Sequence, residues 1–432
     1  MNTEYSTQRI LGPVDGTEYS NGVGTPFIAN HPYTDRNYFV FTGWTAYDGA
    51  QRQVFVAEIS EDFTLSNIRL ILPWNEPGDL TTGGHTTSHV AWDEHHKCWL
   101  VICSEMETTS PIMLAGIYRF NDDFTKYLGY HRIRSLFEDS PGPSGQSLPG
   151  SDGGMPFLRP IFGEQGTEGI FYYGTYTPAT QEAEQRAPTV EKLAIMHTKD
   201  FTSDTIEIDY NDYVFWGGHP AALQPIQTTA ETTVVLVEEL WQQNPWSVKP
   251  IFLCGSGHYP ACTQMYGVEA YGSVIPSFGT GTYHVGHPHA TVHPNGQYYN
   301  FFHTIFRECT PSFRHEIWCT RIPPSRLDPR SYDAFFTQLH VGPVSEDGYR
   351  SKVIPGWFSR ELIVFVESET DGTLTVLGGT EFDGTDTDVD ARAVKAPRAA
   401  CHFNHVTPYF RIAFKPDRPD KNAKISLSLK RT

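Results

Sequence analysis

The sequence predicts an all-β protein, and three observations lead to this prediction. Aromatic residues make up 13% of the 432 residues, and β-strands favour aromatic side chains. The 37 glycines and 31 prolines indicate many turns, as expected where short strands follow one another. Apolar runs of strand length also recur at a regular spacing. The length predicts two domains, one of them large.

Five similar units follow one another in the first three quarters of the chain. Each unit begins with a short apolar run, and a tight turn and an aromatic strand come next. The openings are 63, 71, 65 and 63 residues apart (88−25, 159−88, 224−159, 287−224), and they read TPFIAN at 25, SHVAWD at 88, RPIFGE at 159, QPIQTT at 224 and HPHATV at 287. An Asp-Phe-Thr tripeptide recurs after a later strand, at 62–64, 123–125 and 200–202.

Units of this size cannot bury both faces alone, but they can cover one another when arranged around a channel. We therefore predict a five-bladed β-propeller over residues 20–338, preceded by an N-terminal arm at 1–19. The first strand of each unit is expected to line the channel. Three strands per unit are evident, and a fourth is not.

Residues 339–432 predict a second domain, a small C-terminal β-sandwich or jelly-roll-like module. ELIVFVES and TLTVLGG are expected to form a hairpin around residues 370–372. YFRIAFKP and AKISLSL are expected to form another around residues 416–422. This region resembles accessory domains in tail fibres and adhesins of tailed viruses.

The charge and the N-terminus narrow the classes of function. Lys and Arg number 32 against 50 Asp and Glu, a net charge of −18, which disfavours nucleic-acid binding. The N-terminus lacks a basic start followed by an apolar run, so we expect neither an ordinary signal peptide nor membrane insertion. The seven cysteines are an odd number, and most are expected to be free thiols; Cys254 and Cys262 are the one pair considered for a disulfide.

The segment GHPHATVHPNGQYYNFFHT at 286–304 resembles the last-blade signature of the five-bladed propeller glycoside hydrolases. This clan includes arabinanases, β-xylosidases, α-arabinofuranosidases and invertase relatives. TPFIANHPYTDRNYFVFTG resembles the first-blade opening of the clan, where an Asp usually precedes the Pro. The resemblance covers about three quarters of the chain and implies the propeller fold.

The resemblance also implies where catalytic carboxylates would stand, and here the sequence departs from it. Thr25 occupies the first-blade position, and Arg159 and Gln224 precede the prolines of the third and fourth openings. None of these three can donate a proton to a leaving group or activate water as a carboxyl group does. The nearest acids, which would restore hydrolysis if this alignment is shifted by a few residues, are Asp152, Glu164, Glu231, Glu238 and Glu239.

The histidines of the last blade have two interpretations. By resemblance, His287 lies at the channel axis near a bound cation such as hydrated Ca²⁺, and His89 approaches it. The alternative is that His287 and His289, which share one side of a strand, are hydrogen-bonded structural residues. A catalytic zinc site is disfavoured, because no His-x-x-x-His helix or cysteine partner is present. The acidic loop 379–390 offers oxygen ligands for Ca²⁺, or is simply solvated.

Tryptophans near strand ends are candidates for stacking on sugar rings, or for packing between blades. Trp44 and Trp216 stand out, the latter in a WGGH loop that also contains His219; the others are Trp92, Trp241 and Trp246.

Two hypotheses of function follow. The first is a non-catalytic glycan-binding or structural protein, a virion tail or cell-surface adhesin or assembly component that binds carbohydrate or other protein subunits, as a homo-oligomer or in a larger assembly. The second is a cytoplasmic glycoside hydrolase acting on arabinofuranosides or xylosides.

Overall fold

The structure is a computed structural model, and it describes the chain in segments. These are residues 7–45, 51–75, 84–106, 113–133, 157–161, 167–175, 192–203, 206, 210–216, 220–227, 232–239, 248–254, 268–270, 282–307, 313–356, 359–380, 387–404 and 406–431.

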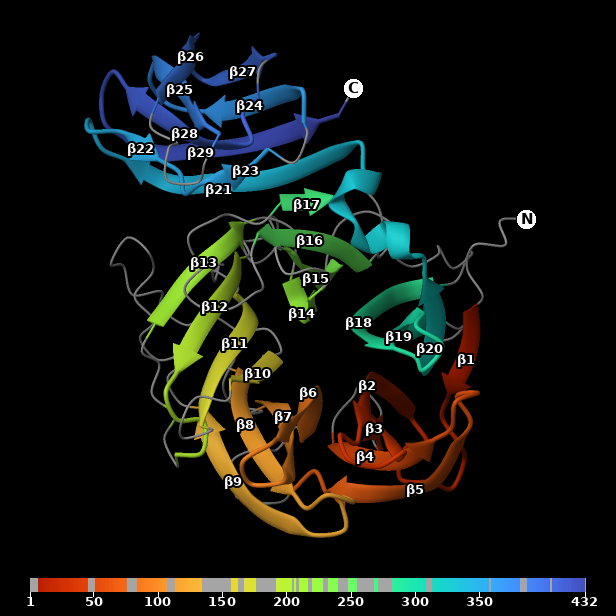
Figure 1. Cartoon of the computed structure of the whole chain (residues 1–432). Helices are drawn as coiled ribbons and strands as arrows, with labels where there is room; N and C mark the ends of the chain where they lie inside the picture. Colours follow the sequence, from red (N-terminus) through yellow and green to blue (C-terminus); the bar gives the residue numbers. More distant parts are fainter. Residues whose placement is uncertain are drawn as a thin grey trace.

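The protein is all-β, and five blades of four strands each surround a central axis (Figure 1). Blade 1 consists of β2 (Gly22–Asn30), β3 (Asn37–Trp44), β4 (Arg52–Ile59) and β5 (Leu65–Leu72). Blade 2 consists of β6 (His85–Asp93), β7 (Cys98–Met106), β8 (Met113–Phe120) and β9 (Tyr127–Ile133). Blade 3 consists of β10 (Phe157–Ile161), β11 (Glu168–Thr175), β12 (Lys192–Thr198) and β13 (Tyr210–Trp216).

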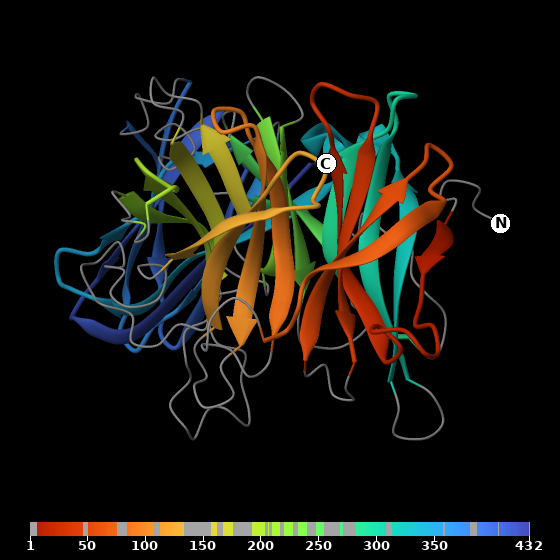
Figure 2. The same cartoon turned by 90° about the horizontal axis from the view of Figure 1, so that it is seen from below.

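Blade 4 consists of β14 (Pro220–Gln227), β15 (Thr232–Glu239), β16 (Val248–Cys254) and β17 (Val268–Ala270). Blade 5 contains β18 (Thr282–Val292), β19 (Tyr298–Arg307) and β20 (Phe313–Ile322). The first strand of each blade is innermost, as predicted (Figure 1). Neighbouring strands within each blade are antiparallel, and Figure 2 shows them side-on.

This alternation gives the propeller two different faces. The turns between first and second strands, and between third and fourth, lie together; we call this the hairpin face, and it includes residues 31–36, 94–97, 121–126 and 293–297. The second strands end and the third strands begin at the opposite end of the channel, as at Trp44 and Arg52 of blade 1, and we call this end the loop face.

The Asp-Phe-Thr repeats form turns between third and fourth strands. In each repeat an Asp Oδ1 accepts a hydrogen bond from the Thr backbone N–H, at 3.4, 3.0 and 2.8 Å for Asp62, Asp123 and Asp200. The side-chain hydrogen bond from Thr125 lowers the pKa of Asp123. The phenylalanine is buried in two of these turns, at Phe124 and Phe201, so the repeat is a structural device of the blades.

The fourth strand of blade 5 comes from the N-terminus. β1 (Thr7–Leu11) pairs with β20 and closes the ring. Arg9 forms an ion pair of 2.9 Å with the buried Glu316, and the hydroxyls of Thr7 and Thr320 are 3.1 Å apart. The prediction that residues 1–19 form a separate N-terminal arm is therefore wrong for Thr7–Leu11, which form a strand of the propeller.

The C-terminal domain is a sandwich of two sheets (Figure 1). One sheet contains β21 (Ala334–Val344), β29 (Asp420–Lys430), β24 (Glu361–Glu367) and β27 (Arg398–Phe403). The other contains β22 (Tyr349–Arg350), β28 (Tyr409–Pro416), β25 (Gly372–Gly379) and β26 (Thr387–Val394), with β23 (Ile354–Pro355) beside β28. The short 3-10 helices η3 (Pro324–Leu327) and η4 (Pro329–Ser331) precede it.

Both predicted hairpins of this domain are wrong. β24 and β25 lie in different sheets, and so do β28 and β29. Each tight turn is an arch that carries the chain from one sheet to the other. The buried Asp420 fixes these arches, since its Oδ2 accepts from the Ser368 hydroxyl at 2.5 Å and from the Glu369 N–H at 2.9 Å.

The sandwich is joined to the propeller by a continuous sheet. β17 of blade 4 pairs with β21, so strands of both domains form one eight-stranded sheet. A common hydrophobic core includes Phe252 of blade 4, Tyr332 of the connection and Phe335 of β21. The sandwich therefore begins before the predicted boundary at residue 339.

Four cysteines of the described chain are buried, Cys98, Cys103, Cys319 and Cys401, and three of them, Cys98, Cys319 and Cys401, are free thiols. Cys262 lies outside the described residues, and so does the side chain of Cys254.

Candidate functional site at the propeller channel

The innermost strands carry a shared irregularity that fixes their alignment. β2 bulges between Gly24 and Phe27, β6 between Thr87 and His89, and β18 between Gly286 and His289. Thr25, Ser88 and His287 each stand five residues before the last residue of their strands (30−25, 93−88, 292−287). These three positions are equivalent, which confirms the predicted alignment of blades 1, 2 and 5.

The predicted alignment of blades 3 and 4 is wrong by two to three residues. Arg159 and Gln224 stand only two and three residues before the ends of their strands (161−159, 227−224). The bulge of β14 lies between Pro220 and Leu223, so Ala222 occupies the position equivalent to Thr25. In blade 3 the described part of the innermost strand begins only at Phe157, and the equivalent position lies outside it.

Thr25 anchors a ladder of hydroxyl groups across blades 1 and 2. Its φ of 47° is unusual for a β-branched residue. Its hydroxyl donates to Oγ1 of Thr42 at 2.6 Å, and Thr42 Oγ1 also accepts from the Thr87 N–H at 2.9 Å. All three residues are buried, so this part of the channel wall is polar, uncharged and held in one conformation.

Gln224 and His289 form a second buried pair, between blades 4 and 5. His289 Nδ1 lies 2.5 Å from Gln224 Oε1, and Gln224 Nε2 donates to the carbonyl of Ala290 at 3.0 Å. Burial lowers the pKa of His289 to about 3, although a hydrogen bond with the Ile28 backbone raises it in part. His289 is therefore neutral near pH 7, and its Nδ1–H donates to Gln224.

Phe27 fills the channel beside this pair. Its ring centroid lies 4.8 Å from that of His289 and 5.7 Å from that of His89. At this level the channel is thus packed with rings from blades 1, 2 and 5, and His289 is a structural residue.

Trp44 lies nearer the loop face, at the end of β3. Its ring centroid is 5.7 Å from that of His303 and 5.1 Å from that of His315, and His303 Nε2 lies 2.9 Å from His315 Nδ1. The guanidinium of Arg52 lies 5.9 Å from the ring centroid of Trp44 and donates to the Thr86 hydroxyl at 2.8 Å. Burial lowers the pKa of Arg52 to about 10, so it stays charged near pH 7.

Trp44 is 5% exposed, and its Nε1–H has no hydrogen-bond partner within the described chain. A buried indole N–H normally has one. The donor is itself buried, so within the described chain it meets neither solvent nor a partner. Trp44 was predicted from the sequence, but Thr42, Thr87 and Arg52 were not, because they come from second, innermost and third strands that no motif singles out. His303 lies in the last-blade segment 286–304, but no role was predicted for it.

Carboxylates are scarce on the channel wall. The five innermost strands, within the bounds given above, contain one acidic residue, Asp93. It is fully buried at the hairpin end of β6, where Oδ1 accepts from the N–H groups of His95 and His96 at 3.0 and 3.1 Å. Its Oδ2 lies 2.7 Å from His96 Nδ1. Asp93 therefore caps a turn and does not face a second carboxyl group on these strands.

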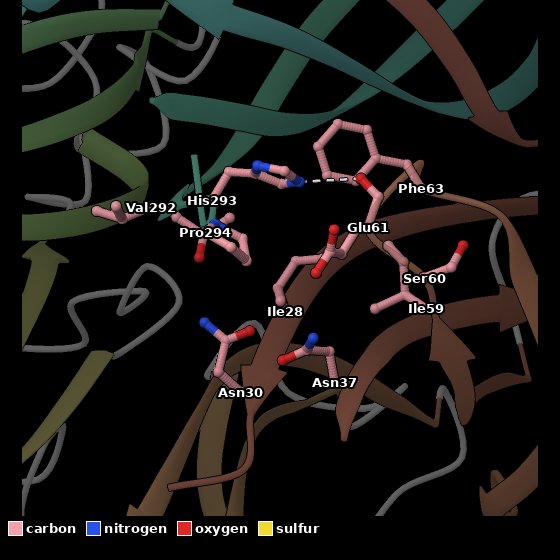
Figure 3. Close-up of a pocket in the computed structure, with 11 residues that line it drawn as sticks. Ile28, Asn30, Asn37, Ile59, Ser60, Glu61, Phe63, Val292, His293 and Pro294 are labelled. Carbon is pink, nitrogen blue, oxygen red and sulfur yellow. Dashed lines mark hydrogen bonds between the residues drawn. The ribbon is translucent and has the colours of Figure 1, made fainter. Parts of the chain in front are cut away.

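His293 is also structural. Figure 3 shows it in a small crevice of about 30 Å³ on the hairpin face, between blades 5 and 1. Its Nε2–H donates to the Glu61 carbonyl at 2.9 Å, and its Nδ1 accepts from the Asn295 N–H at 3.2 Å. Both nitrogens are thus used to join two turns.

Several predicted site residues cannot be placed in full. The side chains of Arg159, Trp216 and His287 lie outside the described part, although their backbones belong to β10, β13 and β18. The same holds for the side chains of Glu238 and Glu239, and for all of Asp152, Glu164, Glu231, His219, Trp241 and Trp246.

The predicted cation sites are likewise only partly described. Residues 381–386 of the acidic loop lie outside the described chain, and Asp388 and Asp390 belong to β26. Among the residues that the structure describes, no three His, Cys, Asp or Glu side chains are grouped to hold a metal ion. Nor does this part of the chain contain a helix long and apolar enough to cross a bilayer.

Comparisons with known proteins give likenesses of structure alone. No family model and no curated protein sequence matches this chain. Among solved structures, a thermostable family-43 glycoside hydrolase shares 12% identity over 71% of this chain and 91% of its own, with a TM-score of 0.47.

A family 117 glycoside hydrolase from the marine bacterium Zobellia galactanivorans shares 12% identity over 74% of this chain and 90% of its own, with a TM-score of 0.48. An α-L-arabinofuranosidase from Lactobacillus brevis shares 9% identity over 70% and 93%, with a TM-score of 0.45. At this level these likenesses carry no conclusion about activity.

Proposed function

We propose that this protein is a non-catalytic carbohydrate-binding protein whose propeller recognises a glycan at the loop-face end of the channel. One observation carries the proposal: within the described bounds of the innermost strands there is a single carboxylate, Asp93, and it caps a turn. Glycoside hydrolysis requires two carboxyl groups, roughly 5 to 9.5 Å apart, on either side of the scissile bond.

The remaining groups suit binding of an uncharged sugar. The wall at this end of the channel is polar and uncharged, because the buried hydroxyls of Thr25, Thr42 and Thr87 are fixed behind it by mutual hydrogen bonds. Trp44 packs against His303 and His315 at the same end and adds buried aromatic surface to this wall. Aromatic faces and uncharged hydrogen-bonding groups together are the usual means by which proteins hold polar organic ligands.

We further propose that the C-terminal sandwich attaches the propeller to a larger assembly, either a virion tail or a cell-surface structure, as one subunit among others. Support comes from the resemblance of this region to tail-fibre and adhesin accessory domains, and from the continuous sheet that fixes it to blade 4. Electron microscopy of particles carrying the tagged protein would test this part separately.

Two measurements test the central proposal. A glycan array should show binding, and nitrophenyl arabinoside, nitrophenyl xyloside and arabinan should not be hydrolysed. Thr25→Val removes the hydrogen bond to Thr42 that fixes this wall, and it should weaken glycan binding by about fivefold, which corresponds to about 1 kcal/mol. Thr320→Val, which removes a buried hydroxyl far from the channel on β20, is the matched control and should bind as the wild type does.

Hydrolysis of any of these substrates, lost on replacing a single Asp or Glu, would establish the glycoside hydrolase alternative instead. Absence of binding to every glycan on the array would leave the propeller a structural element only, and would refute the proposal.

A further inference from the structure

A second hollow lies on the hairpin face, between blades 1 and 2, at the opposite end of the propeller from the loop-face site. It has a volume of about 430 Å³ and is lined by His31, Tyr33, Trp92, Lys97 and Asp122. This volume falls within the roughly 300–1,000 Å³ of small-molecule sites. The first three of these residues give it aromatic walls.

The aromatic rings form a fixed corner. The ring centroid of Trp92 lies 5.1 Å from that of His31 and 6.1 Å from that of Tyr33, and the Tyr33 ring is tilted by 72° against it. Behind them Trp99 packs at 4.9 Å from Trp92 and donates its Nε1–H to the Asp122 carbonyl at 2.8 Å. The Tyr33 N–H donates to His31 Nδ1 at 3.2 Å, which orients the imidazole.

Polar groups at the rim are already arranged around Tyr33. Lys97 donates to the Tyr33 hydroxyl at 2.6 Å, and its Nζ lies 4.6 Å from the centroid of that ring. The Glu94 carboxylate accepts from Trp92 Nε1 at 2.9 Å and also contacts the Tyr33 hydroxyl and Lys97. Tyr33 itself remains 57% exposed, a large exposure for an aromatic side chain held by this many contacts.

We infer that this hollow is a binding site for a neutral sugar unit. An aromatic corner could bind a cation such as a quaternary ammonium group. Here the Lys97 ammonium already lies over the Tyr33 ring and would repel such a ligand. The carboxylates of Glu94 and Asp122 oppose an anionic ligand. The Trp92 and Tyr33 rings meet at a steep angle, so a ligand ring stacks on one of them while its edge groups meet the other ring and the polar rim. A neutral, non-planar ring with one apolar face and several hydroxyl groups meets all three conditions.

The inference does not depend on the loop-face site, since the two lie at opposite ends of the propeller and share no residue. The hollow would give the protein a second glycan-binding site, on the hairpin face at blades 1 and 2.

Saturation-transfer NMR and calorimetry on the full chain, with xylobiose, lactose and cellobiose as probes, test the inference. At least one disaccharide should bind, and Tyr33→Ala should weaken its affinity by about threefold to tenfold, as expected for loss of one aromatic contact. Tyr127→Ala, a control that removes another exposed tyrosine from the same face, should leave the affinity unchanged. Thr25→Val should also leave it unchanged, which separates this site from the loop-face site. Unfolding temperatures establish that each variant is folded.

Equal affinity of Tyr33→Ala and wild type would overturn the inference, and so would failure of all three disaccharides to bind at millimolar concentrations. Binding of choline in place of the disaccharides, lost in Tyr33→Ala, would identify the hollow as a cation site and refute the assignment to a sugar.

Discussion

Protonation of His289 should be linked to the stability of the propeller, because the folded protein holds this ring neutral. Its pKa is lowered from 6.5 to about 3 by burial. Between these values the unfolded chain takes up a proton at this position and the folded protein does not. The free energy of unfolding therefore falls as the pH is lowered below about 6.5, by up to about 1.4 kcal/mol per pH unit. From pH 7 to pH 5 this one group should cost about 2 kcal/mol.

The variant His289→Asn isolates this effect from that of the other histidines. Asn places a donor near the position of Nδ1, so the bond to Gln224 is kept while the titrating group is removed. Urea unfolding followed by tryptophan fluorescence, at pH 7 and pH 5, should show a loss of stability smaller by about 2 kcal/mol in the variant than in the wild type. His402→Asn, which replaces an exposed histidine, is the control and should behave as the wild type. Equal pH dependence in His289→Asn and wild type would refute the buried, neutral state of His289.

Three further changes test other parts of the fold. Gln224→Leu should lower the free energy of unfolding by about 2–4 kcal/mol, because it leaves the Ala290 carbonyl and His289 Nδ1 buried without a partner; urea unfolding measures this. Asp420→Ala should cost about 2 kcal/mol or more. Burial raises the pKa of Asp420, but its hydrogen bonds lower it by more, so the pKa in the folded protein lies below the ordinary value. The wild type should therefore lose this stabilisation as the pH falls below about 4, whereas Asp420→Ala has none to lose. Deletion of residues 1–11 should remove about 3 kcal/mol and expose the edge of β20, seen as a lower unfolding temperature and as aggregates in size-exclusion chromatography.

The propeller could be predicted from sequence because its signals are local. Apolar runs, tight turns and the Asp-Phe-Thr repeat each act within a few residues, and they recur in every blade or in several. The closing strand β1 could not be predicted in this way. It is short and polar, and its partner β20 lies about three hundred residues away in sequence.

The wrong predictions share one physical cause: the local sequence of a turn or a bulge does not determine which strands pair or in which register they pair. A bulge adds a residue without a sequence signal, so counting from Pro225 misplaced Gln224 relative to Thr25. A tight turn also does not reveal whether its two strands pair or cross between sheets, which is why both sandwich hairpins were predicted wrongly.

The pairing of β17 with β21 has a mechanical consequence. Two domains joined by a flexible linker usually reorient freely, whereas here a hydrogen-bonded ladder and a common apolar core connect them. The sandwich and blade 4 must then move together as one rigid body. A load applied to the C-terminal domain is carried into the propeller wall, and the channel keeps a constant direction relative to whatever holds the sandwich.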